Sequence, residues 1–478
     1  MKYFAQNFLN AAFAAAIVCL QAGAAKGQDT KTIQVTNTQD ELTNLLNQNY
    51  IINDSALLPF YQQLYTGRKI NNLSAAILHA GDSHVQMGYW VEQMRKGFAE
   101  NWQIRGLGTT FPYQIAHYNP FYTSSTTSVG WKGSNYLYQS TGLDFGISGF
   151  TAATSLDTAI LTVSIKNAQI ECRQFNQVTI WYRDSLDQYQ LKLDNNAGIM
   201  GISITTEQNK IHGTTTIDSG WSKKIFVFDS LQDQIKLTIQ KPGSSQGRFL
   251  LYNLLFEKTG KVGLLYHNAG VGGAQFFHLC TNATLATTQI TSLDPDLLIL
   301  SYGSNESYRK DFDTAAYRQM VVSFIKKIKA AAPRTTILLT TPPDTRARNT
   351  YPRNTYSIVA ILKKIAIENN VACWDFHAIM GGDGSIYKWL RLKLASSDKL
   401  HLTRNGYDLQ AKLLLYALFN SYNRFVMEDG RVSLTPFVTS IENSYPTKKN
   451  LMAVQVNNPP KYPPYSKKKV QPKKNVKK

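Results

Sequence analysis

The sequence of 478 residues predicts an α/β fold in which a parallel sheet, covered by helices on both faces, is interrupted by an inserted β-sandwich. Near both ends of the chain, apolar strand segments alternate with segments of helical period, which is typical of parallel sheets with right-handed crossovers. Between them, residues 113–258 contain short strands separated by turn residues, as in a sandwich. We therefore expect one domain built from residues 26–112 and 259–428, and a second domain inserted between them.

Residues 1–25 have the features of a secretory signal peptide. Lys2 precedes an apolar stretch near residues 11–20, and the small residues Ala22–Ala25 follow it. The apolar stretch is too short to cross a bilayer, so we expect cleavage near Ala25 and export to the periplasm or the cell surface. Cys19 follows a sequence that fits a lipoprotein site poorly, which makes a lipid anchor the weaker alternative.

The parallel sheet is predicted from five strand segments. The first covers residues 75–80, ends in Gly81-Asp82-Ser83 and is followed by a helix at Trp90–Trp102. The other four strands are expected at Val262–Ala269, Asp296–Ser301, Thr335–Thr341 and Val371–Phe376. Helices follow three of them and are expected at Thr314–Ala331, Asn354–Asn370 and Asn405–Tyr422. Ligands of such sheets bind beyond the carboxyl ends of the strands, so functional side chains are expected there.

The insertion carries six recognisable short strands of alternating pattern, at Ala159–Ile165, Gln177–Tyr182, Gln190–Leu193, Lys224–Phe228, Gln234–Ile239 and Arg248–Leu255. It also contains Trp131, Trp181 and Trp221. Aromatic rings stack on sugars but also fill sandwich cores. The inserted domain is therefore either a carbohydrate-binding domain or a scaffold and lid for the active site.

The positive charge is concentrated at the C-terminus. The chain has 51 Lys and Arg against 32 Asp and Glu, and residues 461–478 alone contain eight Lys and no acid. Residues 429–478 are expected to form an extension whose Lys- and Pro-rich tail is flexible. This tail suits an anionic envelope polymer or a membrane surface, or it serves solubility alone; nothing in the sequence indicates nucleic-acid binding.

The number and spacing of the cysteines and histidines argue against a disulfide framework and against a structural zinc site. Cleavage of the signal peptide leaves Cys172, Cys280 and Cys373, an odd number that does not form a disulfide framework. We expect all three to be free thiols. Paired Cys and His clusters are absent from the sequence, so a structural zinc site is not predicted.

Four short motifs lie at or near the predicted strand ends: Gly81-Asp82-Ser83-His84, Asn268–Gly273, Gly303-Ser304-Asn305 and Asp398–His401. In this order they resemble the SGNH (GDSL-type) hydrolase superfamily. Three further segments resemble its peptidoglycan O-acetylesterase branch: Gly81–Gln86, Met380–Ser385 with Trp389, and His401–Tyr407. The resemblance covers about residues 70–425, with Val85 and Arg404 as departures. It implies a flavodoxin-like, three-layer SGNH hydrolase domain with strand order 2-1-3-4-5.

The resemblance assigns roles that elementary chemistry supports. Ser83 is the expected nucleophile, His401 its general base and Asp398 the carboxylate that orients the imidazole, since a serine hydroxyl needs a base within hydrogen-bond reach. The backbone N–H groups of Ser83 and Gly273 and the Asn305 amide are expected to form the oxyanion hole. His84 should point elsewhere, because consecutive residues at a strand end diverge.

Each assignment has a structural alternative. Ser83 and Asp398 are also residue types that cap helices, Asn305 forms turns, and His401 could be a solvated loop residue. Asp82 is expected to serve mainly in packing and in the turn. The apolar surroundings of His267, His278 and His377 favour core positions.

These observations predict an exported serine esterase that removes O-acetyl groups from a cell-envelope glycan, with peptidoglycan as the first candidate. The mechanism is expected to need no organic cofactor and no metal ion. The alternatives are an acetylesterase of another polysaccharide, a lipase-like acylhydrolase, or a non-catalytic glycan-binding surface protein. The sequence leaves open the acetyl position, hydrolysis against acetyl transfer, and the oligomeric state.

Overall fold

The computed structural model describes residues 38–457, apart from residues 139–141, 169, 185–188, 195–198, 208–219, 242–246 and 261. The predicted signal peptide and the Lys-rich tail lie outside the described residues. None of the helices in the described part of the chain combines the length and the apolar character needed to span a bilayer.

A six-stranded sheet forms the centre of the α/β part, in the order β1-β17-β16-β15-β2-β14. Its five parallel strands are β2 (Ser74–Gly81), β14 (Gly263–Gly270), β15 (Leu297–Ser301), β16 (Thr336–Thr340) and β17 (Ala372–Trp374). Numbered along the chain, these strands follow the order 2-1-3-4-5, which confirms the expected topology. The two-residue strand β1 (Ile51–Ile52) pairs antiparallel with β17. The fifth parallel strand is therefore not an edge strand, contrary to our expectation.

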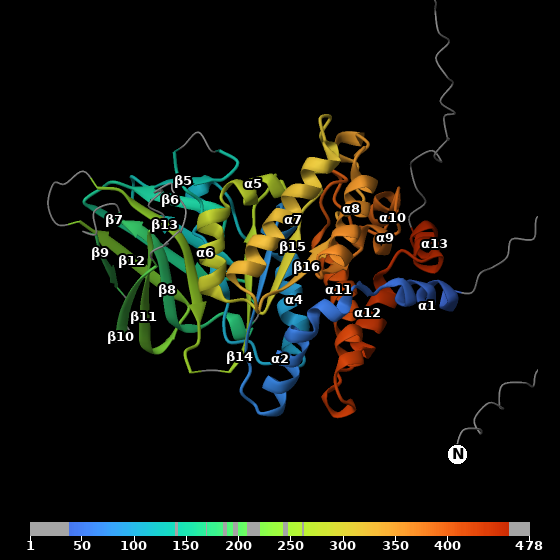
Figure 1. Cartoon of the computed structure of the whole chain (residues 1–478), viewed down its shortest axis with the longest axis horizontal. Helices are drawn as coiled ribbons and strands as arrows, with labels where there is room; N and C mark the ends of the chain where they lie inside the picture. The colour runs from blue at the N-terminus through green and yellow to red at the C-terminus, as the bar shows by residue number, and fades with distance from the viewer. Residues whose placement is uncertain are drawn as a thin grey trace, which may run out of the picture. The chain divides into compact units, whose positions relative to one another are not determined.

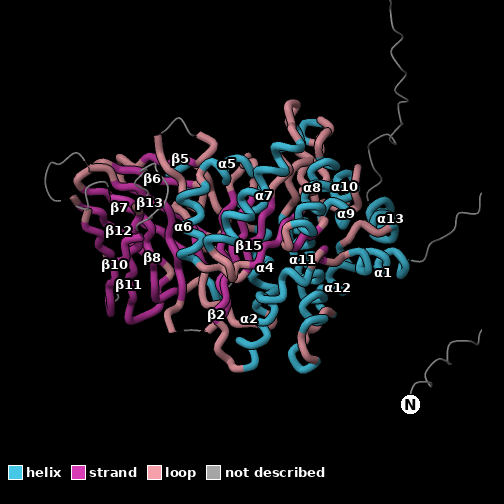
Figure 2. Tube along the Cα trace, viewed as in Figure 1, coloured by secondary structure: helices cyan, strands magenta, loops and turns pink. Residues whose placement is uncertain are grey.

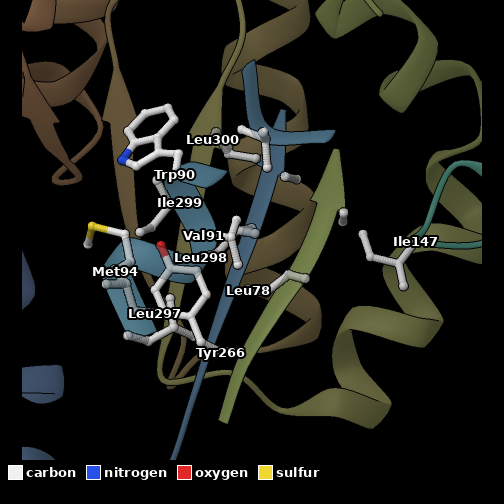
Figure 3. Close-up of a cluster of buried hydrophobic side chains, with 14 of the residues drawn as sticks. Leu78, Trp90, Val91, Met94, Ile147, Tyr266, Leu297, Leu298, Ile299 and Leu300 are labelled. Carbon is white, nitrogen blue, oxygen red and sulfur yellow. The ribbon is translucent and has the colours of Figure 1, made fainter. Parts of the chain in front are cut away.

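The parallel strands are buried on both faces. Every residue of β14, β15 and β16 is buried, and successive side chains of a strand point to opposite faces, so both faces are covered. Figure 3 shows part of this core, where Leu78 of β2 and Leu298 of β15 lie near Trp90 and Val91 of a helix. Such continuous apolar runs explain why these strands were recognisable in the sequence.

The helices form two packed groups. Contacts join α6, α7 and α8 in one group, and join α4 to α11 and α11 to α2 and α12 in the other; Figure 1 shows α7 beside α8. The helices are α1 (Thr38–Gln48), α2 (Leu58–Lys69), α3 (Ser83–Gln86), α4 (Tyr89–Ala99), α5 (Phe276–Thr281), α6 (Ala283–Leu293), α7 (Thr314–Ala331), α8 (Thr355–Glu368), α9 (Phe376–Met380), α10 (Ser385–Arg391), α11 (Arg404–Phe425), α12 (Thr435–Ser444) and α13 (Lys448–Asn457).

The insertion consists of two antiparallel sheets, drawn almost wholly as strands and loops in Figure 2. One has the order β10-β11-β8-β13-β6-β5, with β3 on β13, and the other has the order β4-β7-β12-β9. The strands are β3 (Gly108–Thr110), β4 (Thr123–Thr127), β5 (Lys132–Asn135), β6 (Phe150–Thr154), β7 (Thr158–Ile165), β8 (Phe175–Asp184), β9 (Gln190–Leu193), β10 (Ile199–Glu207), β11 (Trp221–Gln232), β12 (Gln234–Gln240) and β13 (Phe249–Glu257). The first of these strands, β3, begins at Gly108, five residues before the predicted start of the insertion at residue 113.

Two of the insertion's tryptophans belong to its core. Trp181 and Trp221 are 2% and 1% exposed, and their ring centroids are 4.9 Å apart. Trp131 is partly buried and donates from its indole N–H to the Ile160 carbonyl. Because Trp181 and Trp221 have almost no exposed surface, they stabilise the sandwich and offer no face for a sugar.

The insertion is anchored to strand β14. The Thr109 N–H of β3 donates to Nδ1 of His267 at 3.1 Å, and Nδ2 of Asn268 donates to the Tyr122 hydroxyl at 2.8 Å. His267 and Asn268 are consecutive residues of β14. The strand that precedes the Gly270–Gly273 loop therefore also holds the start of the insertion.

Candidate active site

Ser83 lies where strand β2 ends and the short helix α3 begins. Asp82 is the N-cap of α3, and its carboxylate accepts the His84 N–H at 3.0 Å. The turn needs a glycine at position 81, because a Cβ there would lie 2.5 Å from Val85 Cγ2 and 2.7 Å from the Ser301 carbonyl oxygen. This tight turn presents the Ser83 side chain at the carboxyl edge of the sheet.

Ser83, His401 and Asp398 form a continuous hydrogen-bonded series. His401 Nε2 lies 2.9 Å from Ser83 Oγ, and His401 Nδ1 lies 2.7 Å from Asp398 Oδ2. The other Asp398 oxygen accepts the N–H groups of Leu400 and His401 at 2.9 and 3.0 Å. The structure thus brings together three residues that are separated by up to 318 positions in the chain.

Asp398 does not cap the following helix. The N-cap of α11 is Thr403, whose hydroxyl accepts the Gly406 N–H at 3.2 Å. Partial burial opposes ionisation of Asp398, but the hydrogen bonds from the His401 ring and from the two backbone N–H groups outweigh it, so the pKa of Asp398 is lowered. An ionised carboxylate is the form that orients a neutral imidazole.

His84 does not contact the Ser83 hydroxyl. Its Nδ1 lies 3.0 Å from the Tyr407 hydroxyl, and its Nε2 has no hydrogen-bond partner among the described residues. Its ring is packed beside the His401 ring, with centroids 5.5 Å apart. Burial lowers the pKa of His84 to about 3, so His84 is a neutral neighbour of His401.

The loop after β14 lies against Ser83. A Cβ on Gly272 would be 3.7 Å from Ser83 Cβ, and Gly273 has a φ of +81°, a backbone conformation that favours glycine. Neither the Ser83 N–H nor the Gly273 N–H donates to an acceptor within the described part of the chain. Both N–H groups are therefore available to an oxygen atom bound beside Ser83.

Three hydrogen bonds hold this loop. The Gly272 N–H donates to Gln86 Oε1 at 2.5 Å, the Val271 N–H to the Gly81 carbonyl at 2.9 Å, and Asn305 Nδ2 to the Ala274 carbonyl at 2.8 Å. One hydrogen of the Asn305 amide is thus donated to the loop, and the second is left to donate elsewhere. The sequence analysis assigned Asn305 to the oxyanion hole, with a turn residue as the alternative, and missed its contact with Ala274.

Glu306 was also missed. Its carboxylate accepts the Phe276 N–H at 2.6 Å and the Gly303 N–H at 3.1 Å, which joins the ends of the β14 and β15 loops. Burial raises the pKa of Glu306 to about 7 and that of Asp82 to about 6. The position of Glu306 directly after Asn305 was the available clue, because a fully buried acid beside a strand-end motif must meet backbone donors.

A second loop holds the Asp398–His401 segment. The Arg346 N–H donates to the Lys399 carbonyl at 2.7 Å, and Lys399 Nζ donates to Asn349 Oδ1 at 2.7 Å. Lys399 and Asn349 have φ values of +54° and +60°, a region that costs about 1–3 kcal/mol for residues other than glycine. The mutual contacts keep both residues there.

The predicted Met380–Ser385 motif reaches this second loop. Arg346 forms ion pairs with Asp344 and with Asp383, and Asp344 Oδ2 accepts the Ile386 N–H at 3.0 Å. Trp389 is buried and donates to the Met380 carbonyl. The motif therefore supports the Asp398–His401 segment through Arg346.

The other histidines predicted as core residues, and the three cysteines of the described residues, form no hydrogen bond with Ser83, whose hydroxyl contacts His401. His267 accepts the Thr109 N–H, His278 caps helix α5, and the buried His377 ring has no hydrogen-bond partner among the described residues. The three cysteines of the described residues are free, as predicted. No group of three or more His, Cys, Asp or Glu within the described ranges is placed to hold a metal ion.

Comparison with known proteins gives a family match for part of the chain. Residues 242–409, which include Gly273, Asn305, Asp398 and His401, match the model of the GDSL-like lipase/acylhydrolase family. Ser83 precedes the matched segment. A comparison with curated proteins gives no match.

Among solved structures, one of a peptidoglycan O-acetylesterase is similar at 20% identity and a TM-score of 0.61, covering 77% of this chain and 96% of that one. A lipase/acylhydrolase from Enterococcus faecalis has 18% identity and a TM-score of 0.28, covering 34% of this chain and 77% of that one. The matched segment and the fold thus support an esterase with a GDSL-like acylhydrolase domain, whose fold resembles that of a peptidoglycan O-acetylesterase.

Proposed function

We propose that the protein is an exported serine esterase that removes O-acetyl groups from a cell-envelope glycan, with peptidoglycan as its substrate. The observation that carries the proposal is the hydrogen-bonded series Ser83–His401–Asp398 at the carboxyl edge of the sheet. The glycan is supported by the fold similarity to a peptidoglycan O-acetylesterase, which extends over 77% of this chain and thus beyond the segment that matches the GDSL-like family model.

In the proposed mechanism Ser83 Oγ attacks the acetyl carbonyl carbon while His401 Nε2 takes the hydroxyl proton. Asp398 holds the imidazole tautomer and stabilises the imidazolium that forms. The carbonyl oxygen becomes an oxyanion, which accepts hydrogen bonds from the N–H groups of Ser83 and Gly273 and from the second hydrogen of the Asn305 amide.

Collapse of this intermediate breaks the bond to the sugar oxygen. His401 returns the proton to that oxygen, so the sugar leaves with a free hydroxyl and Ser83 carries the acetyl group. Water then attacks the acetyl-enzyme with His401 as base. This step releases acetate and restores Ser83.

The proposed location follows from the substrate. The envelope glycan lies outside the cytoplasm, and residues 1–25, which lie outside the described residues, have the pattern of a cleavable signal peptide. We therefore place the enzyme in the periplasm or at the cell surface. Fractionation of cells that express the full chain, with amino-terminal sequencing of the mature protein, tests this placement.

The activity is tested by acetate release from O-acetylated peptidoglycan, with acetylated xylan as the second substrate and the Ser83→Ala variant as the blank. We expect release from peptidoglycan at the higher kcat/KM and none above the blank with Ser83→Ala. Preference for xylan would replace peptidoglycan by another polysaccharide. Absence of turnover on both glycans and on an aryl acetate would overturn the esterase mechanism.

A further inference from the structure

Two aromatic rings tilted against each other and one arginine form a group at the surface. The guanidinium carbon of Arg404 is 4.9 Å from the Phe121 ring centroid and 6.0 Å from that of Tyr89. The Tyr89 and Phe121 centroids are 4.7 Å apart. Arg404 is exposed and the two rings are partly exposed. We call these three residues the Arg404 platform.

The three residues of the platform come from both predicted domains, the α/β domain and the insertion. Tyr89 begins helix α4, Arg404 begins helix α11, and Phe121 lies within the predicted insertion. Phe121 is held by its neighbour Tyr122, which is buried and accepts the hydrogen bond from Asn268. The chain next to Phe121 is therefore attached to strand β14.

Ring contacts connect the platform to the proposed general base. The Tyr89 ring stacks on Tyr407 with centroids 6.3 Å apart, Tyr407 lies 5.9 Å from His84, and His84 lies 5.5 Å from His401. Met87 is 37% exposed, and its N–H donates to the Ser83 carbonyl, one helical turn away. Met87 Sδ accepts the Tyr407 hydroxyl at 3.6 Å, so Met87 is an exposed side chain in contact with the residues between the platform and His401.

Arg404 has no carboxylate partner among the described residues. Other arginines of the described chain form ion pairs with acids: Arg95, Arg105, Arg183, Arg309, Arg318, Arg334, Arg346 and Arg424. Stacking on Phe121 occupies one face of the guanidinium plane and leaves its N–H edge available. A guanidinium in this arrangement is suited to a planar anion such as a carboxylate.

We propose that Arg404 binds a carboxylate of the glycan substrate, so that the esterase selects acetylated glycans that carry carboxylates close to the O-acetyl group. This proposal rests on the proposed function and specifies its substrate. The stem peptides of peptidoglycan supply such carboxylates. An adjacent sugar ring packs against Met87 and the partly exposed Tyr89 ring, which offer the apolar surface that a pyranose requires.

The experiment uses one substrate in two charge states. O-acetylated peptidoglycan is compared with the same material after its carboxyl groups are converted to methylamides, and acetate release is measured over a range of substrate concentrations. For the wild type, amidation should raise KM about 10- to 100-fold, as expected for loss of a charge-assisted hydrogen bond. For Arg404→Met, which keeps the apolar stem on Phe121, the two substrates should differ by less than about 2-fold, within the scatter expected for independent sites.

Two more variants sharpen the result. Arg404→Lys keeps the charge but not the planar fork, so it should retain part of the discrimination. Arg334→Gln removes another exposed arginine, which precedes β16 and lies away from the platform in the chain, and it should discriminate like the wild type.

The outcomes separate the two proposals. Equal KM of the wild type for both substrates, or full discrimination by Arg404→Met, would overturn the role of Arg404 while leaving the esterase intact. Absence of acetate from untreated peptidoglycan with the wild type would instead overturn the proposed function itself.

Discussion

The role of Asn305 can be separated from that of the loop it contacts. One hydrogen of its amide holds the Ala274 carbonyl at 2.8 Å, and the second is proposed to meet the oxyanion. Gln86 holds the same loop through the Gly272 N–H but is not proposed to touch the oxyanion. The variants Asn305→Ala and Gln86→Ala therefore share the loss of a loop contact and differ in the loss of an oxyanion donor.

The expected magnitudes differ by more than tenfold. Loss of one oxyanion donor costs about 100- to 1,000-fold in kcat. Loss of a neutral hydrogen bond that positions a loop costs about 1 kcal/mol, or roughly 5-fold. We expect Asn305→Ala to fall in the first range and Gln86→Ala in the second, with KM changed less than kcat for Asn305→Ala because the oxyanion exists only in the transition state.

Stopped-flow measurement of acetyl-enzyme formation from p-nitrophenyl acetate gives kcat and KM for both variants, and thermal unfolding checks that each is folded. Equal losses for the two variants would reduce Asn305 to a support of the loop. A loss confined to KM for Asn305→Ala would make it a residue that binds the ground-state substrate.

Three further predictions concern the same site. We expect most of kcat to be lost in each of the variants Ser83→Ala, His401→Ala and Asp398→Asn, and little more in double variants, because the three residues act as one unit. The measurement is turnover of p-nitrophenyl acetate. Full activity of His401→Ala together with an inactive His84→Ala would make His84 the base. The lowered pKa of Asp398 predicts that the Tm difference between wild type and Asp398→Asn is present above pH of about 4, the ordinary range of an Asp carboxyl, and disappears as pH falls through the lowered value. A difference that persists at lower pH would mean that ionisation of Asp398 does not cause it. In a p-nitrophenyl ester series, activity should fall from acetyl to butyryl and be negligible at octanoyl. The reason is that the loops at the strand ends contain Gly272, Gly273 and Gly303 and offer little apolar surface, and each buried methylene contributes only about 0.8 kcal/mol. Preference for octanoyl would favour a lipase-like acylhydrolase.

The five parallel strands and the helices α4, α7, α8 and α11 were predictable because their patterns are local, whereas β1 and helices such as α1, α2, α6 and α12 were not predicted. Helix α7 has the predicted bounds Thr314–Ala331, and its buried residues recur at helical spacing. The parallel strands are mostly apolar, with few polar residues such as His267 and Asn268 of β14, and this composition distinguishes them from polar loops. The motif order resembled that of the SGNH hydrolases, and this resemblance implied the strand order.

Several strands of the insertion carry no such pattern. Strands β4 and β5, Thr123–Thr127 and Lys132–Asn135, contain only polar residues and glycine. They are strands because β7 and β6 supply backbone partners for them. Pairing with a distant strand is a tertiary interaction, and β-propensity depends on it more than helix propensity depends on packing.

The site divides in the same way. The residue types at positions 83, 273, 305, 398 and 401 and their order along the chain suggested a shared site through a family resemblance, and the structure places Ser83, His401 and Asp398 in hydrogen-bond contact. Only the tertiary structure decided what holds them: the Gly272 contact of Gln86, the Ala274 contact of Asn305 and the Lys399 contact of Arg346. It alone set Phe121 beneath Arg404, because contacts between residues hundreds of positions apart depend on how the insertion packs on β14, and no local pattern encodes that packing.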